Sequence, residues 1–484
     1  MIRRLLTSAV LLSCSLVALP VLAQSEAPAT DDHDFSVMHV LADHGLHQLS
    51  PERWNAYGQV TYISSFKAGF SAPYGNLNGS TKSLSAEREH SFTATATLYL
   101  GLALWPGAEL YLAPEVISSR ALSELAGLGA SIQNFELQKQ GQIAPTIYFS
   151  RTYLTQTLDL GGALVERDSG ALQLGSTVHR RRLVLVLGNL SILDYFDKNS
   201  ITGDPRKGFF SIAFMTHGAY DFAADSRGYT WGGLFELHLD DWALRVGRFT
   251  PPKDPNGLDL DFRVLKYYAD QAELEHVHHV LGQPGAVRLL GYRNRENMGA
   301  FTDAVGAFQR DPALDAGACT SYNYGSQNPN APDLCWVRKP HVKFGLGVSF
   351  EQQLSDDVGV FARAMVADGR TEVYSYTSSD RSASLGAVVH GSAWHRPYDT
   401  AGVGLAASWI SSAHAQYLSL GGIDGFIGDG KLNRASERVI ELLYNLHVYR
   451  SLLVSADYQH ISNPAYNADR GPVNVLAGRV HAEF

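Results

Sequence analysis

Long apolar runs are the first thing this sequence lacks. After an apolar N-terminal stretch at residues 5–22, no segment reaches the roughly 18 uncharged apolar residues that a membrane-spanning helix needs. Charged residues are also scarce, at 18% of the chain, whereas soluble proteins carry about 25%. The net charge of −9 excludes the basic surface that is typical of nucleic-acid-binding proteins. The composition therefore argues against a helical membrane bundle, a nucleic-acid-binding protein and an ordinary soluble domain.

Cysteine is the second scarcity, with three residues in the chain. Cys14 lies within the apolar N-terminal stretch, whereas Cys319 and Cys335 lie in a segment rich in Asn, Gly, Pro and Ser. In an oxidising compartment such a pair is expected to close a loop as a disulfide. Two free thiols or a metal pair are the alternatives, but neither His nor a third Cys stands between them. We therefore expect a disulfide, no metal site and no cofactor.

The N-terminus has the features of an export signal. Arg3 and Arg4 precede the apolar stretch, and small residues ending at Ala23 fit a cleavage site, which predicts a signal peptide at residues 1–23. A membrane anchor is the alternative, but the segment is short and the cleavage site follows it. Residues 24–50 show no strand pattern and predict a periplasmic leader with a short helix near residues 35–47.

The C-terminus shows the clearest strand pattern. Leu476, Val480 and Phe484 fall on one face of residues 473–484, and polar residues such as Arg479 fall on the other. Alternation with a period of two is typical of a β-strand. In a transmembrane barrel the apolar face points to lipid and the polar face to the lumen. A terminal Phe after such a strand is also similar to the signal that outer-membrane barrels present to their assembly machinery.

The same alternation recurs along the chain, at residues 92–104, 229–240, 342–351 and 440–448. A soluble sandwich would also alternate, but these runs approach the 9–11 residues that cross a bilayer. Short and long connections also alternate, as they do in membrane barrels. Short turns are expected at residues 105–107, 240–241, 282–285 and 355–357, facing the periplasm. Long connections, facing outward or folded into the lumen, are expected near residues 67–89, 119–145, 194–227, 250–265, 296–340, 372–397, 421–435 and 463–471.

These connections predict an all-β fold. Residues 51–484 are expected to form one transmembrane antiparallel β-barrel of about 16 strands, with short periplasmic turns and long extracellular loops.

Four ordered segments also resemble a known family. They are residues 104–115 (LWPGAELYLAPE), 219–231 (AYDFAADSRGYTW), 289–299 (with LLGYRNR and NMG) and 458–484. They resemble the carbohydrate-selective outer-membrane porins of the OprB type, and the resemblance covers nearly all of residues 50–484. It implies a sixteen-stranded porin in the outer membrane, reached through the periplasm, that lets carbohydrates such as glucose or disaccharides diffuse passively.

Candidate pore-lining residues are polar groups that alternation points inward or that lie on long connections. Sugars need hydrogen-bonding groups around their edges, and charged side chains supply these strongly. The candidates are Glu109, Tyr111, Glu115, Arg120, Arg206, Asp221, Arg245, Arg293 and Arg295. The alternative for each is that the charge only pairs across the wall and holds a loop.

The expected partners follow from this reading. They are small saccharides, outer-membrane lipid and lipopolysaccharide, and the barrel-assembly machinery through Phe484, with no nucleic acid and with one barrel or a homotrimer as the assembly.

Two other functions stay open. The first is a porin for small organic or aromatic acids, which the arginines favour and the negative net charge disfavours. The second is an outer-membrane barrel enzyme such as a hydrolase, which needs a nucleophile beside a base. No motif in the sequence nominates such a pair, so we expect a channel and not an enzyme.

Overall fold

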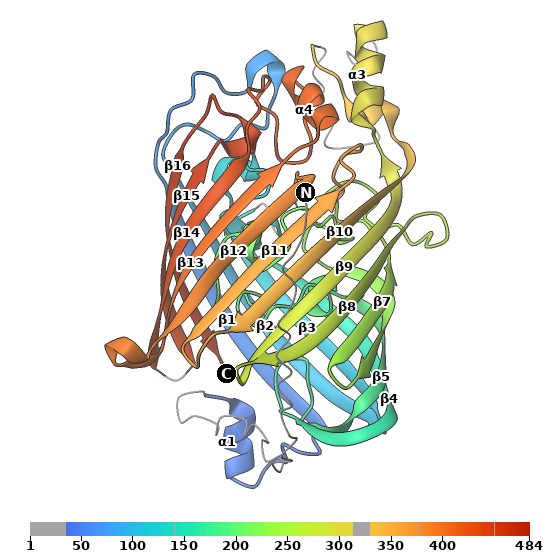
Figure 1. Ribbon diagram of the computed structural model, residues 1–484, viewed down its shortest axis with the longest axis vertical. Helices are drawn as coiled ribbons and strands as arrows, with labels where there is room; N and C mark the ends of the chain where they lie inside the picture. Colours follow the sequence, from blue (N-terminus) through green and yellow to red (C-terminus); the bar gives the residue numbers. More distant parts are fainter. Residues whose placement is uncertain (1–34, 140–141, 313–329, 376, 450) are drawn as a thin grey trace, which may run out of the picture.

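The chain forms a closed barrel of sixteen antiparallel strands (Figure 1). The structure is a computed structural model that describes residues 35–484 except 140–141, 313–329, 376 and 450. Each strand pairs with its neighbour in the sequence, and β1 pairs with β16 to close the sheet. The predicted fold class and strand number are therefore confirmed. The predicted signal peptide lies outside the described residues.

The strands vary from 8 to 22 residues in length. They are β1 (Trp54–Lys67), β2 (Glu89–Trp105), β3 (Ala108–Arg120), β4 (Thr146–Arg167), β5 (Ser176–Leu190), β6 (Thr230–Leu239), β7 (Trp242–Phe249), β8 (Tyr268–Val280), β9 (Gln283–Met298), β10 (Lys339–Gln353), β11 (Val358–Ala367), β12 (Arg381–Gly391), β13 (Arg396–Trp409), β14 (Glu437–Tyr449), β15 (Leu452–Ser462) and β16 (Val473–Glu483). The α-helices are α1 (Val37–Asp43), α2 (Ile212–Met215), α3 (Phe301–Arg310) and α4 (Ser412–Ser419). Among the described residues, no helix is both long and apolar enough to cross a membrane.

Alternation along β16 separates two environments. Leu476 is 59% exposed and Val480 is 46% exposed on the outer face, whereas Arg479 and His481 are buried on the inner face. Charge cannot be solvated by lipid, so the polar side chains point into the lumen. The last strand therefore has the orientation that its sequence predicts.

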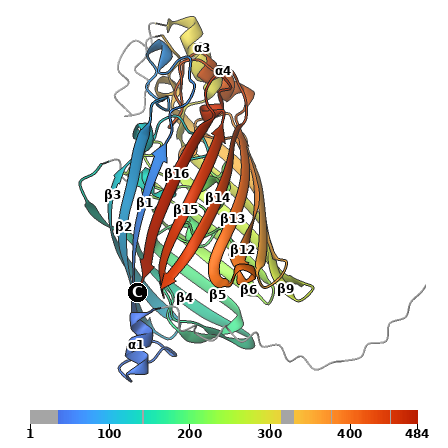
Figure 2. The same ribbon diagram turned by 90° about the vertical axis from the view of Figure 1, so that its left-hand side faces the viewer.

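Short and long connections lie at opposite ends of the barrel. The helix α1 lies at the end with the short turns, and α3 and α4 lie at the other end (Figures 1 and 2). α1 falls within the segment where a short helix is predicted.

Two predicted connections need correction. The predicted long connection at residues 372–397 contains a whole strand, β12. This strand consists largely of small residues, so apolar and polar side chains do not alternate clearly along it. A Cβ at Gly386 would lie 2.7 Å from the ring of Phe361. The turn predicted at residues 282–285 lies earlier, since β9 already begins at Gln283.

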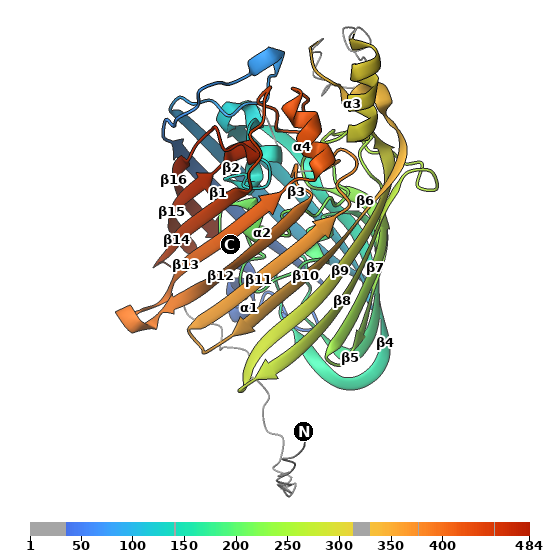
Figure 3. The ribbon, with the colours of Figure 1, turned by 45° about the horizontal axis from the view of Figure 1, so that its top comes forward.

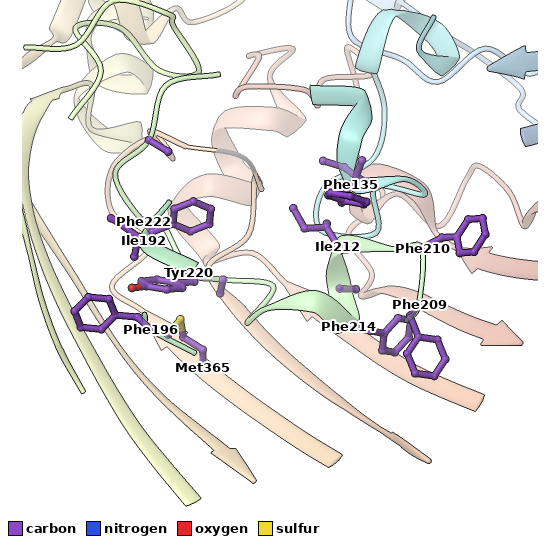
Figure 4. Close-up of a cluster of buried hydrophobic side chains, with 14 of the residues drawn as sticks. Phe135, Ile192, Phe196, Phe209, Phe210, Ile212, Phe214, Tyr220, Phe222 and Met365 are labelled. Atoms are coloured by element: carbon purple, nitrogen blue, oxygen red, sulfur yellow. The ribbon is translucent and has the colours of Figure 1, made fainter. Parts of the chain in front are cut away.

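Two long connections fold into the barrel and fill much of it. They are residues 121–145, between β3 and β4, and residues 191–229, between β5 and β6, which we call the inserted segments. α2 lies on the second of them, inside the barrel (Figure 3). Phe135, Phe210, Phe214 and Phe222 from these segments are buried together in one apolar cluster (Figure 4). The barrel is therefore a wall around its own apolar core and not an open tube.

The terminal Phe484 contributes to closing the barrel. Its backbone N–H donates to the carbonyl of Gly58 at 2.9 Å, and the N–H of Gly58 donates back to the Phe484 carbonyl at 2.8 Å. The phenyl ring occupies the space where a side chain at position 58 would stand, since a Cβ there would lie 2.2 Å from the ring. The last residue thus pairs with β1 through its backbone and covers the glycine through its ring.

Replacing Phe484 with Ala should lower the amount of folded barrel. The backbone pairing can persist, but the ring that covers Gly58 is lost from the seam. Heat-modifiable mobility on semi-native gels, measured on outer-membrane fractions, reports the folded share. Leu476→Ala, a lipid-facing change on the same strand, is the matched control. Normal levels of folded Phe484→Ala protein would contradict this role of the terminus.

Candidate functional site: a charged cavity in the lumen

A cavity of about 1000 Å³ lies between the second inserted segment and the wall formed by β3 to β10. Basic, acidic and aromatic side chains line it together. Lining residues from the wall include Glu109, Tyr111, Tyr153, Arg167 and Arg245, and lining residues from the inserted segments include Lys139, Tyr195, Arg206 and Tyr229. A pore solute of modest size would meet hydrogen-bonding groups and ring faces within this one space.

Glu115 on β3 ties both inserted segments to the wall. It is buried, and it accepts a hydrogen bond from Lys139 at 3.0 Å and one from Arg206 at 3.5 Å. Burial alone would lower the pKa of Lys139, but the negative charge of Glu115 raises this pKa above its ordinary value. Burial and nearby negative charges act in the same opposed way on Arg206, and the net effect raises its pKa. Both side chains therefore stay cationic beside the cavity.

A ladder of alternating charges crosses the wall from β6 to β10. Arg245 on β7 donates to Glu236 on β6 and to two glutamates of β8, Glu273 at 2.9 Å and Glu275 at 3.3 Å. Arg288 on β9 continues the ladder, donating to Glu275 at 2.5 Å and to Glu351 on β10 at 3.0 Å. Inward positions of neighbouring strands come into register, so opposite charges face one another across the sheet. The wall is thereby rigid and densely polar.

An ion pair beside two aromatic rings lies nearer the end of the barrel with the short turns. Arg167 and Glu109 are 3.2 Å apart, and the hydroxyl of Tyr111 donates to Glu109 at 2.7 Å. The ring of Tyr153 lies 5.3 Å from that of Tyr111, centroid to centroid. Ring faces suit the apolar faces of sugars, and the ion pair suits their hydroxyl groups.

The predicted residues fall into three groups. Glu109, Tyr111, Arg206 and Arg245 line the cavity, and Glu115 lies directly behind it. Asp221 holds a loop, because it accepts the backbone N–H groups of Tyr374 and Ser375 and lies 3.2 Å from Lys343. The third group comprises Arg120, Arg293 and Arg295.

The structure places this third group on the outer face of the barrel, away from the cavity. Arg120 donates to the carbonyl of His90, and Arg293 has a side chain that is 56% exposed. On β9 the inward positions are instead Arg288, Tyr292 and Asn294, which are buried. Arg293 and Arg295 are one position out of phase with these, which explains their outward direction.

Several cavity residues are not among the candidates that the sequence predicts. They include Arg151, Tyr153, Arg167, Arg182, Tyr195 and Arg288. Alternation along β4 would have indicated Tyr153, which is in phase with the buried Thr155. A register shift opposite Ala113 and Pro114 hides the direction of Arg151. Tyr195 lies in an inserted segment, where no periodicity reveals the direction of a side chain.

Carboxylates of the wall hold the backbone of the inserted segments. Glu437 on β14 accepts the N–H groups of three consecutive residues, Gly129, Ala130 and Ser131, at 2.8 to 2.9 Å. It also accepts the N–H of Ala465 at 2.8 Å. Four donors thus converge on one buried side chain, and each bond is strengthened by the negative charge.

The second inserted segment is held in the same way. Glu441 accepts the N–H groups of Phe210 and Ser211, and Glu273 accepts the N–H of Asp197 at 2.7 Å. The carboxylate of Asp197 in turn accepts from Arg363 on β11 at 3.0 Å. Burial would raise the pKa of Asp197, but Arg363 and other partners lower it below its ordinary value. The second inserted segment is therefore held at Asp197 by β8 and β11, and at Phe210 and Ser211 by β14.

The predicted disulfide falls partly outside the described residues. Cys335 is buried and disulfide-bonded, whereas Cys319 lies in the undescribed stretch, so their pairing stays a prediction. Within the part of the chain that the structure describes, no three His, Cys, Asp or Glu side chains form a group that could hold a metal ion.

Comparisons with known proteins place this site in context. The family model of carbohydrate-selective porins, the OprB family, matches residues 81–484. The high-pH structure of Pseudomonas putida OprB is similar with a TM-score of 0.66 and 18% identity, covering 92% of this chain and 96% of that one. The outer-membrane channel DcaP of Acinetobacter baumannii gives a TM-score of 0.47 and 9% identity over 89% of this chain and 97% of that one. No match was found among curated protein sequences.

Replacing Glu437 with Gln should loosen the first inserted segment. The amide keeps one acceptor oxygen but turns an NH2 group toward backbone donors, at a cost of roughly 1–3 kcal/mol. Single-channel conductance in planar bilayers should rise, because residues 129–131 lose part of the carboxylate that holds this stretch of the segment against β14. Asp241→Asn, in the exposed turn after β6, is the control. Unchanged conductance in Glu437→Gln would show that this carboxylate does not set the width of the lumen.

Proposed function

We propose that this chain, which belongs to the carbohydrate-selective porin family OprB, selects mono- and disaccharides such as glucose in the cavity described above. The protein is an outer-membrane porin through which carbohydrates diffuse passively into the periplasm. The proposal concerns the solute and the residues that meet it. The observation that carries it is the cavity itself, in which paired charges lie beside ring faces.

Paired charges suit a neutral solute. Arg245 and Arg288 are each held between carboxylates, so an anion would have to compete with those partners. A sugar hydroxyl can instead donate to a carboxylate and accept from a neighbouring guanidinium without breaking the pair. Contacts of this kind are individually weak and repeated along the wall, which lets a solute enter and leave.

The aromatic residues are proposed to contact the apolar faces of the sugar, while the charged residues bind its hydroxyl groups. Three tyrosine rings lie next to one another in the cavity. The ring centroid of Tyr153 is 5.3 Å from that of Tyr111 and 6.4 Å from that of Tyr195. Their rings add apolar surface to the cavity beside the ion pair of Arg167 and Glu109. Sugars have a matching amphipathic character, with apolar ring faces and polar edges.

The competing functions are less well supported. The family and the fold point to a channel and not to an enzyme, and a porin for small organic acids is not favoured by the family. Monomeric or trimeric assembly, neighbouring lipopolysaccharide and recognition of Phe484 by the assembly machinery remain part of the proposal.

Replacing either Glu109 or Arg167 with Gln should weaken sugar block of the single-channel current by up to about tenfold, through loss of one charge-assisted hydrogen bond of roughly 1.5 kcal/mol. Liposome swelling with glucose and with disaccharides should slow in parallel. Arg181→Gln, an exposed arginine paired with Asp240 outside the cavity, should behave as the unaltered protein.

Two outcomes would count against the proposal. If glucose and disaccharides fail to interrupt the current of the unaltered channel, the cavity does not bind them. If small carboxylates interrupt it and sugars do not, the solute is an organic acid.

A further inference from the structure

The outer wall of the barrel carries a groove of about 1060 Å³ across β5 to β10. Small residues form its floor, at Gly233 on β6, Ala272 on β8 and Gly291 on β9. Larger apolar side chains border it, namely Leu185, Phe235, Val246, Phe344 and Leu346. Since these residues face outward, the groove opens toward the membrane and not toward the lumen.

A row of charged residues stands at one end of this groove. Strand register places Arg248 beside Gly233, Asp270 beside Arg248, and Arg293 beside Asp270. Asp270 lies 2.7 Å from Arg248 and 3.9 Å from Arg293. One carboxylate thus faces two guanidinium groups, which leaves a net positive charge at this end of the outer face.

Both guanidinium groups remain accessible. The side chains of Arg248 and Arg293 are 45% and 56% exposed. Both lie over the ring of Tyr268, at 4.2 and 5.4 Å from its centroid. Asp270 engages Arg248 through two hydrogen bonds, at 2.7 and 2.8 Å, but lies 3.9 Å from Arg293, so the Arg293 guanidinium is the main donor to a phosphate and Arg248 adds its charge beside it.

The neighbouring connection between β7 and β8 has the same mixed character. It exposes Phe262 and Leu265, which are 63% and 85% exposed, next to the basic residues Arg263 and Lys266. This loop projects sideways from the barrel on the side of β7 and β8 (Figure 1). Arg263 is paired with Asp261 at 2.5 Å, so the loop offers the lipid–water interface chiefly its exposed apolar side chains.

We propose that this outer-wall groove binds a phosphorylated, acylated lipid of the outer membrane, with an acyl chain in the groove and the phosphate on Arg248 and Arg293. The charged row lies toward the end of the barrel with the long connections, which is the cell-surface side of a porin. The small floor residues let the chain approach the backbone. The positive charge distinguishes this occupant from a second barrel, whose lipid-facing wall would offer an apolar surface and no phosphate.

Native mass spectrometry of the full-length, detergent-purified protein tests the proposal. The unaltered protein is incubated with bisphosphorylated lipid A and, separately, with the same lipid stripped of its phosphates. The bisphosphorylated lipid should bind at least about tenfold more tightly, because the stripped lipid forfeits the ionic contacts.

Three variants locate the site. The double variant Arg248→Gln and Arg293→Gln should lose the preference for phosphate. Gly291→Leu should reduce binding of both lipids by filling the groove, and it has room to fold because a Cβ there meets Leu346 at 3.9 Å. Arg438→Gln, an exposed outward arginine on β14, should bind like the unaltered protein. Heat-modifiable mobility confirms folding of each variant.

Three results would overturn the proposal. The first is equal binding of the two lipids by the unaltered protein. The second is an undiminished phosphate preference in the double variant. The third is that the unaltered protein forms an oligomer, which the variants dissociate into monomers while their lipid binding stays unchanged. This wall would then be an interface between copies of the chain.

Discussion

The backbone N–H groups of the inserted segments impose the constraint on which the rest of this structure depends. Two long connections enter the lumen, where little regular secondary structure can supply acceptors for their backbone N–H groups. A buried donor without an acceptor is costly in free energy. Carboxylates of the wall supply the acceptors. Glu437 takes three such bonds from the first segment, and Glu441 and Glu273 take others from the second.

The shape of the cavity follows from these clamps. Phe210 is held by Glu441 on β14, and Asp197 is held by Arg363 on β11. The second inserted segment therefore covers part of the lumen, and the cavity is the part of the lumen that stays open beside β3 to β10. Arginines and glutamates of the wall then neutralise one another in a ladder across the open side. Carboxylates of the wall therefore have two roles. Glu273 holds an inserted segment, and Glu275 and Glu351 line the cavity.

The sequence predicts the barrel well because alternation is a local property. Residues of β16, and Glu109, Tyr111 and Arg245, could be assigned to the lumen from the phase of their neighbours. Arg293 and Arg295 point outward, because they alternate with the inward Tyr292 and Asn294 on β9. The inserted segments could not be folded from sequence, because their contacts join distant residues. Ala130 and Glu437, for example, are 307 positions apart.

Removal of the second inserted segment tests the central claim most directly. Leu190 and Thr230 are paired neighbours at the ends of β5 and β6, so a short Gly-Ser linker can replace residues 195–225 without opening the wall. Single-channel recording with and without glucose should then give a larger conductance and no interruption of the current by the sugar. A conductance and a sugar block equal to those of the full chain would contradict the account.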